Sequence, residues 1–215
     1  MGLIKEKQEK QLKEIFSKLD ENVKLVFFTQ EMECQYCSET KQLLHDIVAL
    51  SEGKITVEVY DFVSDKDKAE KYNIDKIPAT VVEGIKDYGI RFYGIPAGYE
   101  FTSLISSILA VSKNESGLSD ETKNALKKLN IPVHIQTFVT VTCPYCPKAV
   151  ELSHRIAIES DFVRADMVES SEFPHLVQKY NVMSVPKVLV NDTIEMEGAL
   201  PEKEYIENIM KVLES

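Results

Sequence analysis

The stretch Val133-His-Ile-Gln-Thr-Phe-Val-Thr-Val-Thr-Cys-Pro-Tyr-Cys146 joins an apolar run directly to a C-x-x-C motif. The same arrangement occurs once before, where Val23-Lys-Leu-Val-Phe-Phe-Thr29 precedes Cys34-Gln-Tyr-Cys37. Short apolar runs of this length are typical of buried strands. The sequence therefore predicts, twice, a buried strand whose end leads to a pair of cysteines.

The rest of the chain repeats with nearly the same spacing, which indicates two similar units. Cys34 and Cys143 are 109 residues apart, and the other recurring residues are Tyr72-Asn73 and Tyr180-Asn181, Pro78 and Pro186, and Gly94 and Gly198. At roughly 100–200 residues per domain, a chain of this length can hold two small domains. We place the boundary near residue 116, in the small and polar stretch 112–118, which gives domains 1–115 and 116–215.

Hydrophobic periodicity predicts the same order of elements in both units. In the first unit these are an N-terminal amphipathic helix, a strand at 23–29, a helix from Cys34 onward, a strand at 55–60, a helix at 66–72, strands at 79–83 and 90–94, and a helix at 100–111. In the second unit they are a helix capped by Ser119, a strand at 133–139, a helix at 144–160, a strand at 162–168, a helix at 172–180, strands at 187–191 and 194–197, and a helix from Glu202. This order indicates the α/β class, with a mixed sheet covered by helices on both faces.

Composition excludes several classes of protein. Hydrophobic residues make up 44% of the chain and charged residues 28%, as in ordinary globular proteins. The net charge of −10 argues against nucleic acid or anionic lipid as the main partner. No stretch approaches about 18 uncharged apolar residues, and the N-terminal stretch MGLIKEKQEKQLKEIF alternates charged with apolar residues where a signal peptide needs a continuous apolar run. We expect a cytoplasmic protein without a membrane or nucleic-acid partner.

All four cysteines belong to the two motifs, and in a cytoplasmic chain this usage indicates redox catalysis or metal binding. A cysteine near a helix N-terminus has a lowered thiol pKa, because unpaired N–H groups and the helix dipole favour the thiolate. A second cysteine one turn further can resolve a mixed disulfide with a substrate. We therefore assign Cys34 and Cys143 as nucleophiles and Cys37 and Cys146 as resolving thiols.

Two other uses of the cysteines stay open at this point. The four thiols could form one zinc site, although zinc ribbons usually separate their pairs by about 15–20 residues and 105 residues separate Cys37 from Cys143. Two purely structural disulfides are the other alternative, although so short a bridge restricts the unfolded chain little. No glycine-rich nucleotide motif is present. We expect no cofactor besides redox-active disulfides, and no metal.

The motifs together carry a family resemblance. Each C-x-x-C is followed, 44 or 43 residues after its first cysteine, by Ile77-Pro78 or Val185-Pro186, then two strands and a helix, and this pattern resembles the thioredoxin superfamily. Two such units in tandem, with the segment Tyr93-Gly-Ile-Pro-Ala-Gly98, resemble the glutaredoxin-like protein disulfide oxidoreductases of hyperthermophilic archaea and bacteria. The resemblance implies two tandem thioredoxin-like domains, each a central mixed β-sheet flanked by helices. It also implies a thermophilic origin.

The same resemblance implies a function. It predicts thiol–disulfide exchange on protein disulfides, by reduction, formation or isomerisation, with a thioredoxin-reductase-like flavoenzyme as electron donor. It implies that Pro78 and Pro186 are cis and that Ile77 and Val185 offer their backbone to an extended substrate. Tyr36 and Tyr145, inside the motifs, either contact substrate or only pack on their neighbours.

The two sites differ in local charge. Three carboxylates, Glu31, Glu33 and Glu39, surround the first motif, whereas Lys148 replaces Glu39 in register beside the second. Like charges raise a thiol pKa and opposite charges lower it, so we predict that Cys143 is the more acidic nucleophile and the C-terminal site the more reactive. The predicted strands before the motifs offer no buried carboxylate as proton acceptor for the resolving thiols.

Two functions compete with a general protein disulfide oxidoreductase. One is a binding module that holds a metal or an iron–sulfur cluster on its cysteines. The other is a dedicated electron donor to a peroxide-reducing or ribonucleotide-reducing enzyme. Two complete C-x-x-C sites favour the handling of protein disulfides in general.

Overall fold

The computed structural model describes residue 4 and residues 6–214, so residues 1–3 and 5 of the N-terminal stretch interpreted above lie outside the described part. The helices are α1 (Glu6–Phe16), α2 (Cys37–Leu50), α3 (Lys66–Lys71), α4 (Glu100–Lys113), α5 (Asp120–Leu126), α6 (Cys146–Glu159), α7 (Pro174–Lys179) and α8 (Glu202–Met210), followed by a 3₁₀ turn at Lys211–Leu213. The strands are β1 (Val23–Thr29), β2 (Ile55–Asp61), β3 (Ala79–Glu83), β4 (Asp87–Tyr93), β5 (Val133–Val139), β6 (Val163–Glu169), β7 (Lys187–Val190) and β8 (Ile194–Glu197).

The predicted order of elements is confirmed, and the boundaries are where the prediction was wrong. β4 begins three residues earlier than expected, because Asp87 continues the antiparallel pairing with Glu83 although the segment has no apolar alternation there. α2 and α6 begin at the second cysteine of each motif, not at or just after the first. The first cysteine therefore lies in the loop before the helix. Ser119 is confirmed as an N-cap, because its side chain accepts a hydrogen bond from the Thr122 N–H.

All eight strands form one mixed sheet in the order β2-β1-β3-β4-β6-β5-β7-β8. Within each half, one strand pair is parallel and two are antiparallel, with β1 and β5 in the middle. The halves join through the parallel pair β4 and β6, where Ile90 to Tyr93 lie opposite Ala165 to Val168. The pairing covers two strand edges that would otherwise expose unpaired backbone groups.

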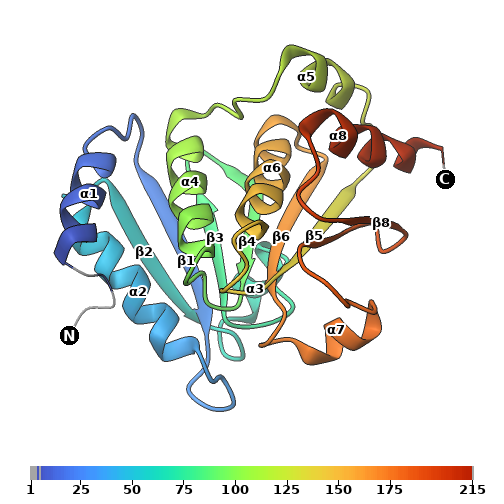
Figure 1. The fold of residues 1–215 in the computed structure, drawn as a ribbon. Coiled ribbons are helices and arrows are strands. Elements are labelled where there is room, and N and C mark those ends of the chain that lie inside the picture. The colour runs from blue at the N-terminus through green and yellow to red at the C-terminus, as the bar shows by residue number, and fades with distance from the viewer. Residues whose placement is uncertain (1–3, 5, 215) are drawn as a thin grey trace.

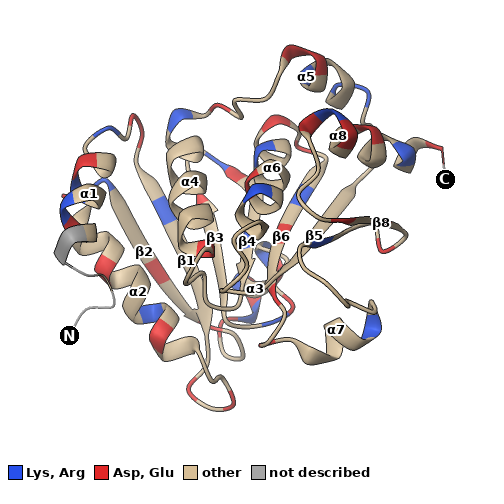
Figure 2. Ribbon diagram, in the orientation of Figure 1, with Lys and Arg blue, Asp and Glu red and all other residues tan. Residues whose placement is uncertain are grey.

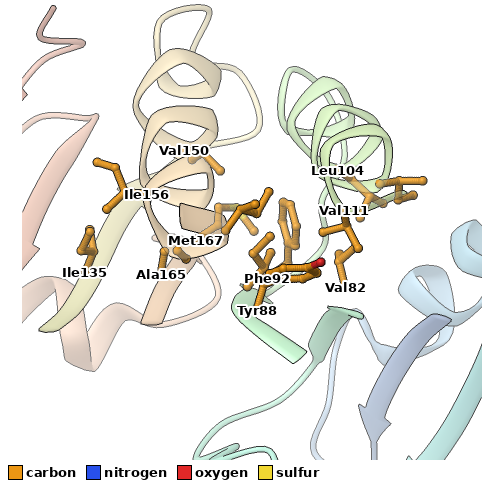
Figure 3. Close-up of a cluster of buried hydrophobic side chains, with 14 of the residues drawn as sticks. Val82, Tyr88, Phe92, Leu104, Val111, Ile135, Val150, Ile156, Ala165 and Met167 are labelled. Atoms are coloured by element: carbon orange, nitrogen blue, oxygen red, sulfur yellow. The ribbon is translucent and has the colours of Figure 1, made fainter. Parts of the chain in front are cut away.

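Helices cover both faces of the sheet, as the element order predicted (Figure 1). Alternate residues of a strand point to opposite faces, so Leu25 and Phe27 of β1 enter the larger core beneath α1, α2, α4, α6 and α8, whereas Val26 and Phe28 enter the smaller core beneath α3 and α7. The larger core is continuous between the halves. Figure 3 shows side chains of β3, β4 and α4 packed against those of β6 and α6.

Candidate active site

The first C-x-x-C lies where β1 ends and α2 begins. Cys34 and Cys37 form a disulfide with their Cα atoms 5.5 Å apart. Cys34 is half-buried and Cys37 is buried, so the first sulfur is the accessible one. Tyr36, between them, anchors the helix, because its carbonyl oxygen accepts hydrogen bonds from the N–H and the hydroxyl of Thr40.

The second C-x-x-C occupies the equivalent place between β5 and α6. Cys143 and Cys146 form a disulfide, also with a Cα separation of 5.5 Å, and both are buried. The Cys146 N–H, in the first turn of α6, points at the Cys143 Sγ at 3.2 Å. Such an N–H favours negative charge on that sulfur, because it adds to the positive end of the helix dipole. Pro147 fits the same turn, where a missing N–H costs no hydrogen bond.

The two predicted cis peptide bonds are confirmed at Ile77-Pro78 and Val185-Pro186. The Val185 carbonyl oxygen lies 3.8 Å from the Cys143 Sγ, which brings the residue before the proline directly against the second disulfide. The carbonyl oxygens of both prolines accept equivalent hydrogen bonds, from Gly94 N–H at 2.9 Å and from Gly198 N–H at 2.8 Å. The tertiary fold thus brings together residues that lie more than forty positions apart in the sequence.

The two motif tyrosines have different surroundings. Tyr145 is 69% exposed beside the second disulfide. Tyr36 is half-buried and forms part of the wall of a cavity between α1, α2 and the start of α4. Because the two tyrosines hold the same position in the motif, the difference comes from the elements around them.

The charges near the two sites lie as the sequence indicated. Glu31, Glu33 and Glu39 are all exposed near the first disulfide, and Figure 2 shows the acidic residues in the loop between β1 and α2. Lys148 is exposed in the first turn of α6. The backbone before the two motifs also differs. Glu33, directly before Cys34, has a positive φ of 59°, whereas Thr142, its counterpart before Cys143, does not have a positive φ.

Sequence reasoning missed a buried carboxyl group at the start of α4. Glu100 has no exposed surface, and its Oε2 accepts a hydrogen bond from the Ser103 hydroxyl at 2.7 Å. Its Oε1 has no hydrogen-bond partner among the described residues. Burial raises the pKa of Glu100 to about 7, the Ser103 hydrogen bond lowers it, and the negative charge of Glu151 raises it.

The position of Glu100 follows from the packing of α4 along α6. Hydrogen bonds join Ser106 to Glu151 and Ser107 to His154, so the two helices run in the same direction, side by side in Figure 1. Glu100, the first residue of α4, therefore lies beside the first turn of α6, which holds Cys146.

The chain immediately before Glu100 is fixed on the second motif. The Tyr99 N–H donates to the Val141 carbonyl oxygen at 3.0 Å, two residues before Cys143. The first half of the chain thus places a buried carboxyl group near the start of α6. One signal could have found this residue, because Glu100 shares the apolar stripe of its helix with Leu104 and Ile108.

A second unexpected carboxyl group lies where the halves meet. The Oε1 of Glu172 accepts a hydrogen bond from the Ile95 N–H at 2.6 Å. Burial raises the pKa of Glu172 to about 7; the hydrogen bond from Ile95 lowers it and the charge of Glu169 raises it. Gly94 packs so closely on both glutamates that a Cβ there would clash with the Cβ of Glu169 at 2.6 Å.

The thioredoxin domain family matches residues 122–211, and a family described as a domain of unknown function matches residues 9–94. A protein disulfide oxidoreductase from Aeropyrum pernix is 31% identical in sequence; its crystal structure superposes with a TM-score of 0.91, over 98% of this chain and 94% of that one. The chain belongs to the protein disulfide oxidoreductase family. It is, accordingly, a thioredoxin-fold protein with two disulfide-capable C-x-x-C sites, as the sequence resemblance implied.

The same architecture occurs in alkyl hydroperoxide reductase. An N-terminal domain of the AhpF component of this enzyme in Enterococcus faecalis is 31% identical, with a TM-score of 0.89 over 96% of this chain and 99% of that one. The corresponding AhpF protein of Pseudomonas aeruginosa is 28% identical over 169 residues, 78% of this chain. The chain spans only about a quarter to a third of the length of the curated relatives it matches, 26% to 30% for the first three.

The four cysteines cannot share one metal ion. β1 and β5, which lead to the two motifs, are four strand spacings apart in the sheet, or about 19 Å, whereas a zinc–sulfur bond is about 2.3 Å. Within the described part of the chain, no three His, Cys, Asp or Glu side chains gather where they could hold a metal ion. None of the helices in this part combines the length and the apolar character needed to cross a bilayer.

Proposed function

We propose that this protein exchanges electrons with the disulfides of protein substrates through two independent dithiols, Cys34 with Cys37 and Cys143 with Cys146. The observation that carries the proposal is that each motif forms a disulfide at the N-terminus of a helix, with the Val185 carbonyl oxygen 3.8 Å from the Cys143 Sγ at the second site. We also propose that the halves 1–115 and 116–215 are two domains that share one sheet.

At the second site, the Cys143 thiolate attacks one sulfur of a substrate disulfide, and the other substrate sulfur leaves as a thiolate. The Cys146 thiol then gives its proton to Glu100 and attacks the Cys143 sulfur. The second substrate sulfur leaves as a thiolate and takes up a proton. Two electrons have passed from the dithiol to the substrate, and the Cys143–Cys146 disulfide has formed. The reverse sequence forms a substrate disulfide.

Glu100 suits the role of proton acceptor because its pKa of about 7 lets it hold or release a proton near neutral pH. A buried carboxylate with one unpaired oxygen also has a lone pair available for a proton.

Substrate recognition is proposed at the residues before the prolines. An extended substrate segment would pair with the backbone of Ile77 at the first site and of Val185 at the second, in the manner of an added strand. Pro78 and Pro186 shape these edges, and Tyr36 and Tyr145 border them. The 3.8 Å approach of the Val185 carbonyl to the Cys143 sulfur supports this arrangement, because a substrate held there has its sulfur close to the nucleophile.

We further propose that the second site is the more reactive one. The N–H of Cys146 already points at the Cys143 sulfur, and exposed Lys148 stands near the second motif where exposed Glu39 stands near the first. Both differences favour a thiolate at Cys143.

An equilibrium redox titration tests the central proposal. Free thiols are alkylated at each potential and counted by intact mass, for the native protein and for the C34S/C37S and C143S/C146S variants. We expect four thiols to convert reversibly to two disulfides without release of metal. Each variant should keep one two-electron step at its native potential, because the strands that lead to the two motifs are about 19 Å apart in the sheet, too far for direct exchange. Thiols that resist oxidation until a metal is removed would contradict the proposal.

A second candidate is electron transfer to a peroxide-reducing enzyme. It is supported by the similarity to the AhpF component of alkyl hydroperoxide reductase in several bacteria. In both cases a thioredoxin-reductase-like flavoenzyme is the proposed electron donor. Turnover with insulin as a disulfide substrate, compared with turnover with a thiol-dependent peroxidase as the acceptor, distinguishes a general from a dedicated donor.

A further inference from the structure

A cavity of about 360 Å³ lies beside the first C-x-x-C, between α1, α2 and the segment 95–101 that leads into α4. Its wall is mainly apolar and includes Tyr36, Leu43, Ile95 and Phe101. The volume falls at the small end of ligand pockets, about 300–1,000 Å³, which are likewise mostly apolar with few polar groups.

The cavity adjoins the reactive part of the first site on two sides. Tyr36 stands between the two cysteines of the motif, so a molecule bonded to Cys34 lies next to this wall. Ile95, which also lines the cavity, directly follows Gly94, whose N–H donates a hydrogen bond to the carbonyl oxygen of Pro78. A molecule that bonds to Cys34 and runs past Pro78 therefore passes the cavity.

The residues that line the cavity favour an apolar, uncharged ligand. Apolar side chains gain free energy when they leave water for such a cavity. The carboxylate of Glu39, which also lines it, disfavours acidic side chains. The two motif tyrosines differ, because Tyr145 is 69% exposed whereas Tyr36 is half-buried in the wall of this cavity.

We propose that this cavity binds a large apolar side chain of a disulfide-bonded polypeptide, next to the cysteine that forms a mixed disulfide with Cys34. The inference rests on the proposed function of Cys34. In the step concerned, the Cys34 thiolate forms a bond to the substrate sulfur, the substrate S–S bond breaks, and the other substrate sulfur leaves as a thiolate. The first site thereby prefers substrates with leucine-sized to tryptophan-sized residues beside the cysteine.

The test uses the C143S/C146S variant, so that only the first site reacts, with three peptide disulfides that differ in one residue beside the cysteine: Trp, Leu or Ser. We expect kcat/KM to be about tenfold higher for the Trp and Leu peptides than for the Ser peptide. Equal values for the three peptides would overturn the proposal and leave the proposed function intact. If no peptide is reduced, the proposed function of this site fails and the cavity proposal fails with it.

A trapped complex gives a second, direct measurement. In a C37S/C143S/C146S variant the mixed disulfide with Cys34 persists, because no resolving thiol is left. The chain contains no tryptophan, so the fluorescence of the trapped Trp peptide reports only on the peptide. We expect a blue-shifted emission and protection from acrylamide quenching. Emission and quenching like those of the free peptide would overturn the proposal.

Ala97, in the cavity wall, provides a matched pair of variants. A97F fills the cavity, and A97S changes the same residue while leaving the space open. In the C143S/C146S background we expect A97F to reduce the Trp-to-Ser preference to less than twofold and A97S to retain it. A preference that survives A97F would show that the side chain binds elsewhere.

Discussion

Replacing Glu100 by glutamine provides the sharpest test of the second site. The substitution keeps the shape of the side chain and its hydrogen bond from Ser103 but removes the titrating carboxyl group. Two results are expected from the same cause. The protein becomes more stable at alkaline pH, and exchange at Cys143 and Cys146 becomes slower, because a buried charge is removed together with the proposed proton acceptor.

The magnitude follows from the pKa. In the folded protein the pKa of Glu100 is raised from 4.5 to about 7, mainly by burial. The protonated form therefore stabilises the fold; this contribution is complete below pH 4.5 and is lost as the pH rises through 7. At about 1.4 kcal/mol per pKa unit, deprotonation of this residue lowers the free energy of unfolding of the native protein by about 3 kcal/mol. The free energy of unfolding of E100Q should accordingly be about 2–3 kcal/mol higher than that of the native protein at pH 8.5 and equal to it at pH 4.5.

Urea unfolding of both proteins, with both disulfides kept oxidised, measures the difference in the free energy of unfolding at each pH. Stopped-flow reduction of a peptide disulfide by the C34S/C37S variant, with and without E100Q, measures the rate. We expect a loss of up to about 100-fold, the lower end of what a positioned general base contributes. A stability difference that does not change with pH, or an unchanged rate, would refute the assignment of Glu100.

Three further results are expected. Thiolate absorbance, titrated in variants that keep one motif intact, should give Cys143 a lower pKa than Cys34, and the reverse order would contradict the charge argument. G98A should unfold at a clearly lower urea concentration than G117A. Both glycines have positive φ, but a Cβ at Gly98 would lie 2.1 Å from the Val141 carbonyl oxygen, whereas a Cβ at Gly117 meets open space. We expect the free energy of unfolding to fall by more than about 2 kcal/mol in G98A and by about 1 kcal/mol in G117A. E172Q should stabilise the protein above pH 7 and not below pH 4.5, because burial raises the pKa of Glu172 to about 7; unfolding curves with the same pH dependence as the native protein would exclude a buried carboxylate there.

Much of the site could be predicted from sequence because its parts are local. The two C-x-x-C motifs, the strands before them and the helices after them follow from spacing and periodicity, which depend on near neighbours along the chain. The prolines at 78 and 186 were found through the repeat and the family resemblance. The starts of α2 and α6 were misplaced, because apolar spacing does not reveal which residue of a C-x-x-C turn first adopts helical geometry.

His45 and His154 show where local information ends. Both stand eleven residues after the first cysteine of their motif, at the same position of equivalent helices. His45 is exposed, whereas His154 is buried against Ser107 and Phe92, and burial lowers its pKa to about 3. The repeat gave no sign of this difference, because α6 faces α4 of the other half.

The sequence by itself determined the order of elements, the two dithiols and their family. Only the tertiary structure decided that β4 and β6 pair, that the two halves share one sheet, and that Glu100 of the first half lies beside the turn of α6 that holds Cys146. Local periodicity specifies which residues of an element are buried. Which edges of two similar units pair depends on the fit between surfaces that are distant in sequence, and that fit exists only once the chain has folded.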